Sequence, residues 1–338
     1  VKRVMIMIIV TLVVMVVATS AEEEPPPLTV VSAANSRYAL KEIAVMLEVG
    51  MRARREGIRA RLIAYNLGDL GLCPREGAGH IPSRLWHDFG IEFRHFDFNS
   101  YPAHVASLHC YAWKAPIVAE VAREVGNASV VMWIDSGVAL LKPLRGVIAT
   151  ARRNGGFASD DTAFSIARFS HESMLSYFVD RFHLAPEVAE QLIAKRREKG
   201  KSLDSADGLS TDLARFKNCN GAFSAHVAAS PRFATITERW LACSLDKDCV
   251  CPRGSTRANH RQDQAALTLF AVMDGYVCGS DGKFVAAHGL KNHQAILHKV
   301  GIGEADSVRG IFCPARNTTS KGAYHHGPER ALFVNSVA

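Results

Sequence analysis

The pattern of hydrophobic positions near the start of the chain predicts strands that alternate with helices. Residues 28–32 form a short apolar run that is typical of a buried strand. Residues 37–55 then carry apolar side chains at three-and-four spacing, with Ser36 as the expected cap and Gly57 as the stop. A second strand follows over 58–65. A β-α-β beginning of this kind predicts parallel neighbouring strands in one sheet.

The alternation continues into the middle of the chain and becomes less regular afterwards. The expected strands lie at 91–98, 130–134, 157–161 and 218–223, and the expected helices end at Val125 or cover 144–153, 186–199, 229–245 and 261–273. The composition is 48% hydrophobic and 22% charged, which is that of a globular chain with an ample core. These features predict an α/β fold with a mixed, mostly parallel sheet flanked by helices.

A single carboxylate follows the most apolar of these strands. The run 130–134 ends at Asp135, and the small residues Ser136 and Gly137 come next. In open α/β sheets, ligands bind at the carboxyl ends of the strands, so Asp135 is well placed to face a ligand. Asp-Ser-Gly is also typical of turns, and Asp135 could therefore be only a turn former. The strand alone leaves both interpretations open.

The first residues have the layout of a secretory signal. Two basic residues precede an apolar stretch over 4–17, and small residues follow before 22–27, EEEPPP. We expect 1–21 to be a signal peptide or an uncleaved signal anchor. The apolar stretch is shorter than the roughly 20 residues of a spanning helix, which favours cleavage. Residues 22–27 are then a linker, and a lumenal or extracellular domain covers 28–338.

The cysteine content agrees with an oxidising compartment. The chain has eight cysteines, an even number that favours disulfides, most of them in the C-terminal half. The pairing does not follow from the sequence. Zinc binding by Cys243, Cys249 and Cys251 is a weaker alternative, because the group lacks a C-x-x-C pair. Asn127 and Asn317 lie in sequons and are expected glycosylation sites if exposed.

The formal net charge of +7 raises the question of a polyanionic partner. Much of the excess lies in 52–61 and 195–201, which we expect to form solvated helix faces. No nucleic-acid motif is present and the export signal argues against such a partner. Nucleic acid is therefore not expected, and a membrane contact is expected only through an uncleaved anchor. A phosphate-bearing small substrate would suit the charge.

Four segments occur in an order that resembles a known enzyme class. They are Trp113-Lys114 before a helix, the Trp-Ile-Asp-Ser-Gly segment around Asp135, Asn220-Gly-Ala-Phe, and His260-Arg-Gln-Asp-Gln. With the β-α-β beginning, they resemble nucleotide-diphospho-sugar transferases of the GT-A type. The chain is similar to a family of secreted GT-A-like proteins of nematodes and other eukaryotes. It more distantly resembles glycogenin-type and galactosyltransferase-type enzymes, over roughly 28–301.

The resemblance implies a Rossmann-like GT-A domain with a nucleotide-binding half at 28–161 and a sugar and acceptor half at 162–338. It implies a UDP-sugar donor, a glycan or glycoprotein acceptor, and a location in the Golgi or ER lumen or outside the cell. A non-catalytic carbohydrate- or nucleotide-binding pseudo-glycosyltransferase is the alternative. A disulfide-stabilised structural protein is a further one.

The resemblance also implies substrate-binding residues. Ala33, Asn35 and Tyr38 would contact the nucleoside, although Tyr38 could instead pack in the core. Lys114, beside Trp113, would place a positive charge on the diphosphate, unless it is a solvent-facing lysine. The sugar pocket would be shaped by Asn220 and Gly221, unless they form a plain turn, and would include Gln264; Gly137 completes the expected substrate-binding set.

Two aspartates would be catalytic. Asp135 matches the first Asp of a D-x-D motif, which binds Mn²⁺ or Mg²⁺ and the ribose. The second carboxylate is replaced by Gly137. Either another residue, such as Asp160, Asp161 or His288, completes the metal site, or the enzyme works without metal. Asp263 would be the general base of an inverting enzyme or would orient the sugar in a retaining one, unless it is only a helix N-terminal acid.

Overall fold

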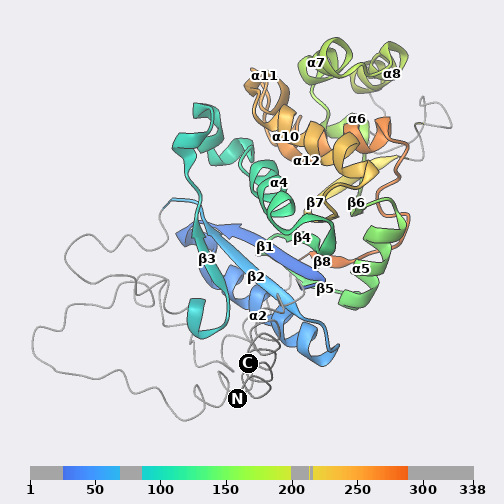
Figure 1. The fold of residues 1–338 in the computed structure, drawn as a ribbon. Helices are drawn as coiled ribbons and strands as arrows, with labels where there is room; N and C mark the ends of the chain where they lie inside the picture. The colour runs from blue at the N-terminus through green and yellow to red at the C-terminus, as the bar shows by residue number, and fades with distance from the viewer. Residues whose placement is uncertain (1–25, 69–85, 199–212, 214–215, 288–338) are drawn as a thin grey trace, which may run out of the picture.

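The computed structural model describes residues 26–68, 86–198, 213 and 216–287. A six-stranded sheet forms the centre of the molecule, in the order β3-β2-β1-β4-β7-β6 (Figure 1). Its strands are β1 (Leu28–Ala34), β2 (Ala60–Asn66), β3 (Glu92–His95), β4 (Val130–Ile134), β6 (Phe157–Ser165) and β7 (Lys217–His226). β1, β2, β3 and β4 are parallel, whereas β7 runs antiparallel to both β4 and β6. This arrangement confirms the predicted mixed, mostly parallel sheet.

A small second sheet joins two segments that are far apart in the sequence. β5 (Val138–Leu140) pairs antiparallel with β8 (Val285–Ala287). Asp160 reinforces this contact, because its carboxylate accepts hydrogen bonds from the backbone nitrogens of Phe284 at 2.7 Å and Val285 at 3.0 Å.

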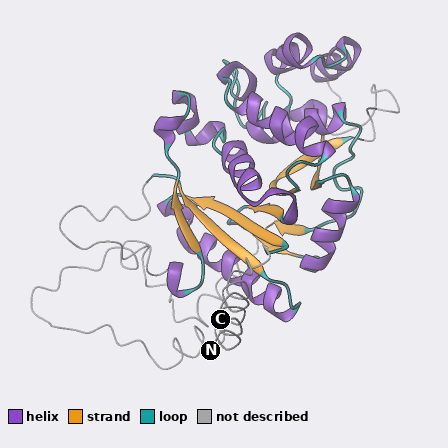
Figure 2. Cartoon of the chain, in the orientation of Figure 1, coloured by secondary structure: helices purple, strands orange, loops and turns teal. Residues whose placement is uncertain are grey.

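Helices cover both faces of the central sheet (Figure 2). One face packs against α2 (Ala39–Arg55) and α5 (Leu144–Arg153). The other packs against α4 (Lys114–Val125), α10 (Arg239–Ser244), α12 (Gln262–Met273), α7 (Glu172–Phe182) and α8 (Pro186–Arg197). The short helical segments are η1 (Ser36–Tyr38), η2 (Phe98–Ser100), η3 (Ala103–Ala106), η4 (Leu108–Cys110), η5 (Gly126–Ala128), α6 (Ile166–Phe169), the π-helix η6 (Phe233–Glu238) and α11 (Lys247–Val250).

The two faces explain why the strands are continuously apolar. Successive side chains of a strand point to opposite faces. In β4, Val131 and Trp133 therefore join the core under α4, while Val130, Met132 and Ile134 join the core over α2. A strand that is buried on both faces needs apolar residues at every position, which the run 130–134 provides.

In the first half of the chain the predicted elements are present with changed boundaries. The first long helix begins at Ala39 with Tyr38 at its N-cap, so the expected cap at Ser36 is wrong and Ser36 instead begins η1. The strand expected over 91–98 is shorter, because the Asp97 side chain accepts a hydrogen bond from Asn99 and begins η2. The helix over 144–153 and the stop at Gly57 are confirmed.

The second half departs further from the prediction. β6 extends to Ser165 and β7 covers ten residues, so both are longer than expected. The helix expected over 229–245 divides into η6 and α10. α6, α7, α11 and β8 were not expected at all. α12 covers the helix expected at 261–273 and is buried on nearly every side.

Disulfides connect the described cysteines in three pairs, Cys110–Cys251, Cys219–Cys278 and Cys243–Cys249. The zinc alternative is therefore wrong, because each of its three sulfurs is in a disulfide. Cys73, Cys313 and the predicted signal at 1–21 lie outside the described residues. Asn127 is exposed in η5, as a glycosylation site requires. Among the described helices, none combines the length and hydrophobicity needed to cross a bilayer.

Some basic side chains that we expected to be solvated instead form contacts within the fold. Lys195 is 1% exposed and pairs with Glu198 at 3.6 Å. Arg52 donates to the carbonyl oxygens of Lys142 and Leu140 at 3.0 and 3.1 Å. The expectation of purely solvated helix faces is therefore wrong for these residues.

Candidate functional site

The carboxyl ends of three parallel strands meet at one edge of the sheet. Ala34 at the end of β1 is in register with Asn66 at the end of β2, and β1 also pairs with β4, which ends just before Asp135. A cavity of about 470 Å³ opens at this edge. Seven predicted site residues line it: Ala33, Asn35, Tyr38, Trp113, Lys114, Asp135 and Gly137. We refer to it as the strand-end cavity.

A second cavity of about 290 Å³ lies next to the first, toward β7 and α12. The other described residues of the predicted site line it: Asn220, Gly221, Asp263 and Gln264. Tyr111, Lys114 and Asp135 belong to the walls of both cavities. We refer to it as the arginine cavity, because Arg257 and Arg261 also line it. The two spaces are therefore neighbouring parts of one cleft.

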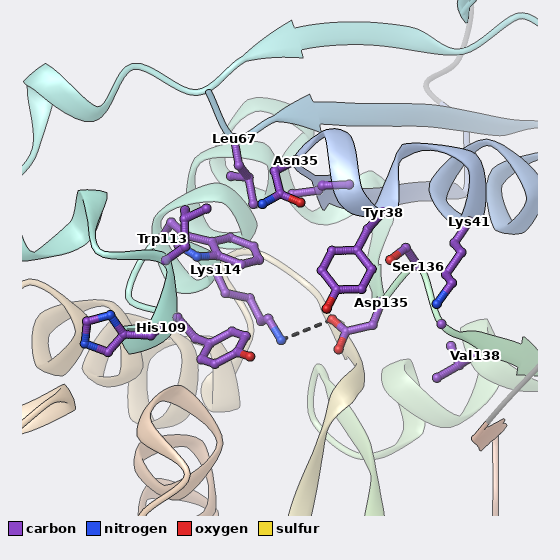
Figure 3. Close-up of a pocket in the computed structure, with 15 residues that line it drawn as sticks. Asn35, Tyr38, Lys41, Leu67, His109, Trp113, Lys114, Asp135, Ser136 and Val138 are labelled. Carbon is purple, nitrogen blue, oxygen red and sulfur yellow. Dashed lines mark hydrogen bonds and ion pairs between the residues drawn. The ribbon is translucent and has the colours of Figure 1, made fainter. Parts of the chain in front are cut away.

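Lys114 lies where the two cavities meet and contacts all the other predicted motifs. Its Nζ donates to Asp135 Oδ1 at 3.1 Å and to the Gly221 carbonyl oxygen at 2.7 Å. Nζ also forms an ion pair with Asp263 Oδ2 at 3.3 Å. Figure 3 shows the lysine extending toward Asp135. The side chain is only 4% exposed, so the alternative of a solvent-facing lysine is wrong.

Asp135 has a fixed orientation although it is the more accessible carboxylate. Its Oδ1 accepts a second hydrogen bond from Trp133 Nε1 at 2.9 Å. Its backbone nitrogen donates to the Ala222 carbonyl oxygen at 2.9 Å, which attaches the end of β4 to β7. The side chain is 40% exposed. Asp135 is therefore positioned by Lys114, by the core residue Trp133 and by the backbone of β7, and a role as a mere turn former does not account for these contacts.

Burial and neighbouring charges have opposite effects on the pKa values of Lys114 and Asp263. Burial acts to lower the pKa of Lys114, but the carboxylates of Asp135 and Asp263 outweigh it and raise that pKa above its ordinary value. Burial raises the pKa of Asp263, although the ammonium of Lys114 opposes this shift. A buried carboxylate with a raised pKa is a stronger proton acceptor than an exposed one.

Asp263 lies at the start of α12, opposite the small residue Gly221. It lies in the first turn of α12, as the helix-acid alternative requires, but its carboxylate additionally contacts Lys114. Trp240 Nε1 donates to the Asp263 carbonyl oxygen at 3.0 Å. A Cβ at Gly221 would lie 3.3 Å from the Cβ of Gln264, so a glycine permits this close approach. Asn220 and Gly221 lie within β7, and the plain-turn alternative for them is wrong.

Tyr38 faces the strand-end cavity instead of the core. Its residue exposure is 40%, so the core-packing alternative is wrong. The side chains of Arg37 and Lys41 lie over its ring, at 5.4 and 5.5 Å from the centroid. Figure 3 shows Tyr38 and Asp135 facing the same space. An exposed aromatic ring near two cations is suited to contact a planar, anion-bearing ligand.

The described residues do not fit the divalent-cation site that the family resemblance implies. The carboxylates at the cleft, Asp135 and Asp263, both contact the ammonium of Lys114, and a metal shared by them would have to displace it. Asp160 binds the backbone of β8, and Asp161 forms ion pairs with Lys283 and with Lys217. His288, the other predicted ligand, lies outside the described residues.

Several residues of the cleft were not found from the sequence. Tyr111 and Gln262 have positive φ angles of 53° and 37°, a conformation that non-glycine residues seldom adopt. Arg257 donates to the Tyr111 hydroxyl, and its guanidinium lies 5.0 Å from the ring centroid. Arg261 packs over the Phe169 ring at 4.6 Å. One sequence feature could have indicated Arg261. It lies in the same His260-Arg-Gln-Asp-Gln segment as the predicted site residues Asp263 and Gln264.

Comparison with known proteins gives structural matches alone. The sequence matches no protein-family profile and no curated protein. A galactosyltransferase LgtC in complex with donor and acceptor sugar analogues is 14% identical, covering 74% of this chain and 72% of LgtC, with a TM-score of 0.35. Core-mannan synthase A from Aspergillus fumigatus, in a Mn/GDP form, is 10% identical over 76% of this chain and 72% of the synthase, with a TM-score of 0.42. The bifunctional glycosyltransferase WbbM is 10% identical over 80% and 50%, with a TM-score of 0.37. Because all three TM-scores are low, the function of this chain is argued below from its own residues.

Proposed function

We propose that this protein is a glycosyltransferase of the GT-A type that moves a sugar from a UDP-sugar to a glycan or glycoprotein acceptor. One observation carries the proposal. Lys114 Nζ contacts Asp135, Gly221 and Asp263 within 3.3 Å, although these residues are up to 149 positions apart from it in the sequence and belong to separate motifs. A purely structural role would not require the four motifs to converge on two adjoining cavities.

The strand-end cavity would take the nucleoside. Ala33 and Asn35 would contact the base and ribose, and Tyr38 would stack on a planar group. Lys114 would then meet the diphosphate at the junction of the cavities, with Trp113 and Gly137 as neighbours in the wall. A lysine supplies a compact positive charge that suits phosphate oxygens.

The arginine cavity would take the transferred sugar and the acceptor. Asn220 and Gln264 offer amide groups that suit sugar hydroxyls, and Asp263 lies between them and Lys114. In an inverting reaction, Asp263 would accept the proton of the attacking acceptor hydroxyl. In a retaining reaction, it would orient the donor sugar. No step is assigned to Mn²⁺ or Mg²⁺, because the described residues do not fit such a site.

Secretory localisation, in the Golgi or ER lumen or outside the cell, forms part of the proposal. The three disulfides support it, since disulfides persist in oxidising compartments. Exposed Asn127 would be available to the glycosylation machinery of that pathway.

The experiment is a panel of UDP-sugars offered to the full chain purified from secreting eukaryotic cells, with detection of released UDP. We expect one UDP-sugar to give slow hydrolysis by itself and faster UDP release with a glycan acceptor. UDP binding without turnover of any donor would favour the pseudo-glycosyltransferase alternative, for which the missing second carboxylate at Gly137 argues. Absence of both binding and turnover would refute the proposal.

A further inference from the structure

The cleft carries an excess of fixed positive charge. The described walls of the two cavities contain the basic side chains Lys41, Lys114, Arg257 and Arg261, against the carboxylates of Asp135 and Asp263. A nucleoside diphosphate is an anion, and transfer of its sugar adds negative charge to the departing phosphate. Such charge needs a positive partner in the transition state.

Two of these cations converge on one aromatic ring at the junction of the cavities. Lys114 Nζ lies 5.8 Å and the Arg257 guanidinium 5.0 Å from the centroid of Tyr111. The ring belongs to the walls of both cavities. Cys110, the neighbour of Tyr111, is disulfide-bonded to Cys251, which fixes the segment carrying Arg257 beside the start of α4.

The arginine is well suited to an anion. The Arg257 residue is exposed, and its guanidinium offers five donors in a planar arrangement that matches phosphate oxygens. Arg261 is the second cavity-lining cation on the same segment as Arg257, and among the described residues its Nε has no hydrogen-bond partner. An arginine that binds a phosphate contributes directed, charge-assisted hydrogen bonds.

We propose that the chain itself supplies the positive charge for the diphosphate, through Lys114 and Arg257, and that nucleotide binding needs no divalent cation. This inference rests on the proposed glycosyltransfer. When the bond between the anomeric carbon and the diphosphate oxygen breaks, its electron pair remains on that oxygen beside the two cations. The acceptor oxygen forms the new bond to the anomeric carbon, and its proton passes to Asp263 or, in a retaining reaction, to the departing phosphate.

The test is isothermal titration calorimetry of the full chain with UDP and with inorganic pyrophosphate, which probes the cations without a base. Each titration is run after EDTA treatment and again with excess Mn²⁺. We expect both ligands to bind in EDTA, with little change when Mn²⁺ is added. Arg257→Gln should weaken binding about tenfold, the loss typical of one charge-assisted contact. Arg253→Gln is the matched control, because Arg253 is exposed on the same segment and lies in neither cavity wall.

The outcomes separate the two proposals. Binding that appears only with Mn²⁺ would overturn metal independence while leaving glycosyltransfer intact. Equal affinities of the Arg257→Gln and Arg253→Gln variants would also overturn the inference. Failure of UDP to bind under either condition would refute the proposed function and this inference with it. Lys114→Met is not used, because it would leave buried Asp263 without its ion-pair partner and destabilise the fold.

Discussion

The two walls of the cleft are built in different ways. Much of the strand-end cavity is formed by residues at or directly after the ends of β1, β2 and β4, and Trp113 and Lys114 are added from the start of α4. The arginine cavity combines antiparallel β7, the first turn of α12 and a segment attached by Cys110–Cys251. The strand-end cavity therefore follows mostly from the general rules of α/β sheets, whereas the arginine cavity depends on specific covalent and polar contacts.

The disulfide that joins the two walls should have the largest effect on stability. Cys110–Cys251 closes a loop of 141 residues, whereas Cys243–Cys249 closes one of 6. Loop-closure entropy predicts losses of about 5 and about 2 kcal/mol on replacement of the respective pairs by serine, measured by urea unfolding. Replacement of Cys110 and Cys251 should also weaken UDP binding, since Tyr111 and Arg257 would lose their fixed relation. Equal losses of unfolding free energy in the two variants would show that Cys110–Cys251 does not stabilise the contact between the two cavities.

Removal of the charge at the junction should have the next largest effect. Asp135→Asn should lower kcat/KM for UDP-sugar turnover by about 100-fold, because the Asp135 carboxylate holds the Lys114 ammonium at 3.1 Å and a displaced ammonium would no longer meet the phosphates. Because the side chain is 40% exposed, the midpoint of thermal unfolding should change little. Asp180→Asn, on the exposed surface of α7, is the matched control. Unchanged turnover in Asp135→Asn would remove Asp135 from the mechanism.

The two regions should also respond to pH in opposite ways. On the β7 side, burial lowers the pKa of His226 to about 3 and that of His260 to about 4. Protonation therefore favours the unfolded chain, whose histidines titrate near 6.5. The free energy of unfolding should fall by up to about 1.4 kcal/mol per pH unit for each histidine as the pH drops from 6.5 toward 4. Imidazole NMR signals of the neutral ring at pH 5 would confirm the cause, and protonated rings in the folded protein would contradict it.

Under the strand-end side, α2 contains the reverse case. Glu42 is fully buried, and burial raises its pKa well above the ordinary value. A raised pKa in the folded state means that ionisation costs stability as the pH rises above about 4.5. Glu42→Gln should therefore increase the free energy of unfolding at pH 7 and change it little at pH 4, as chemical denaturation at both values can test. A loss of stability at pH 7 would indicate that the carboxylate has a stabilising partner.

The smallest expected effect restores the missing carboxylate. A Cβ at Gly137 would meet no atom within 4 Å, so Gly137→Asp should be accommodated. With a second carboxylate beside Asp135, Mn²⁺ should now strengthen UDP binding several-fold, or by about 1 kcal/mol, in contrast to the wild-type protein. Gly146→Asp, also in open space but on α5, is the control. Identical Mn²⁺ responses of the two variants would refute this assignment.

The difference between the two cavities also explains how much of the fold and of the site the sequence could predict. Apolar runs and turn residues were sufficient to predict β1, β4, α5 and the position of Asp135. The order of the motifs was sufficient to predict that Lys114, Gly221 and Asp263 belong to one site. β7 was underestimated because it contains buried polar residues, such as Ser224 and His226, that are tolerated only through mutual hydrogen bonding at 2.8 Å. Arg257 could not be assigned, since its place depends on which cysteines pair.

A crystal structure of the protein with UDP tests most directly whether the two cavities are one nucleotide-sugar site. We predict the phosphates between Lys114 and Arg257, and the uracil and ribose in the strand-end cavity beside Ala33, Asn35 and Tyr38. The arginine cavity should then remain open for a sugar. UDP bound at another surface, with both cavities empty, would contradict the account.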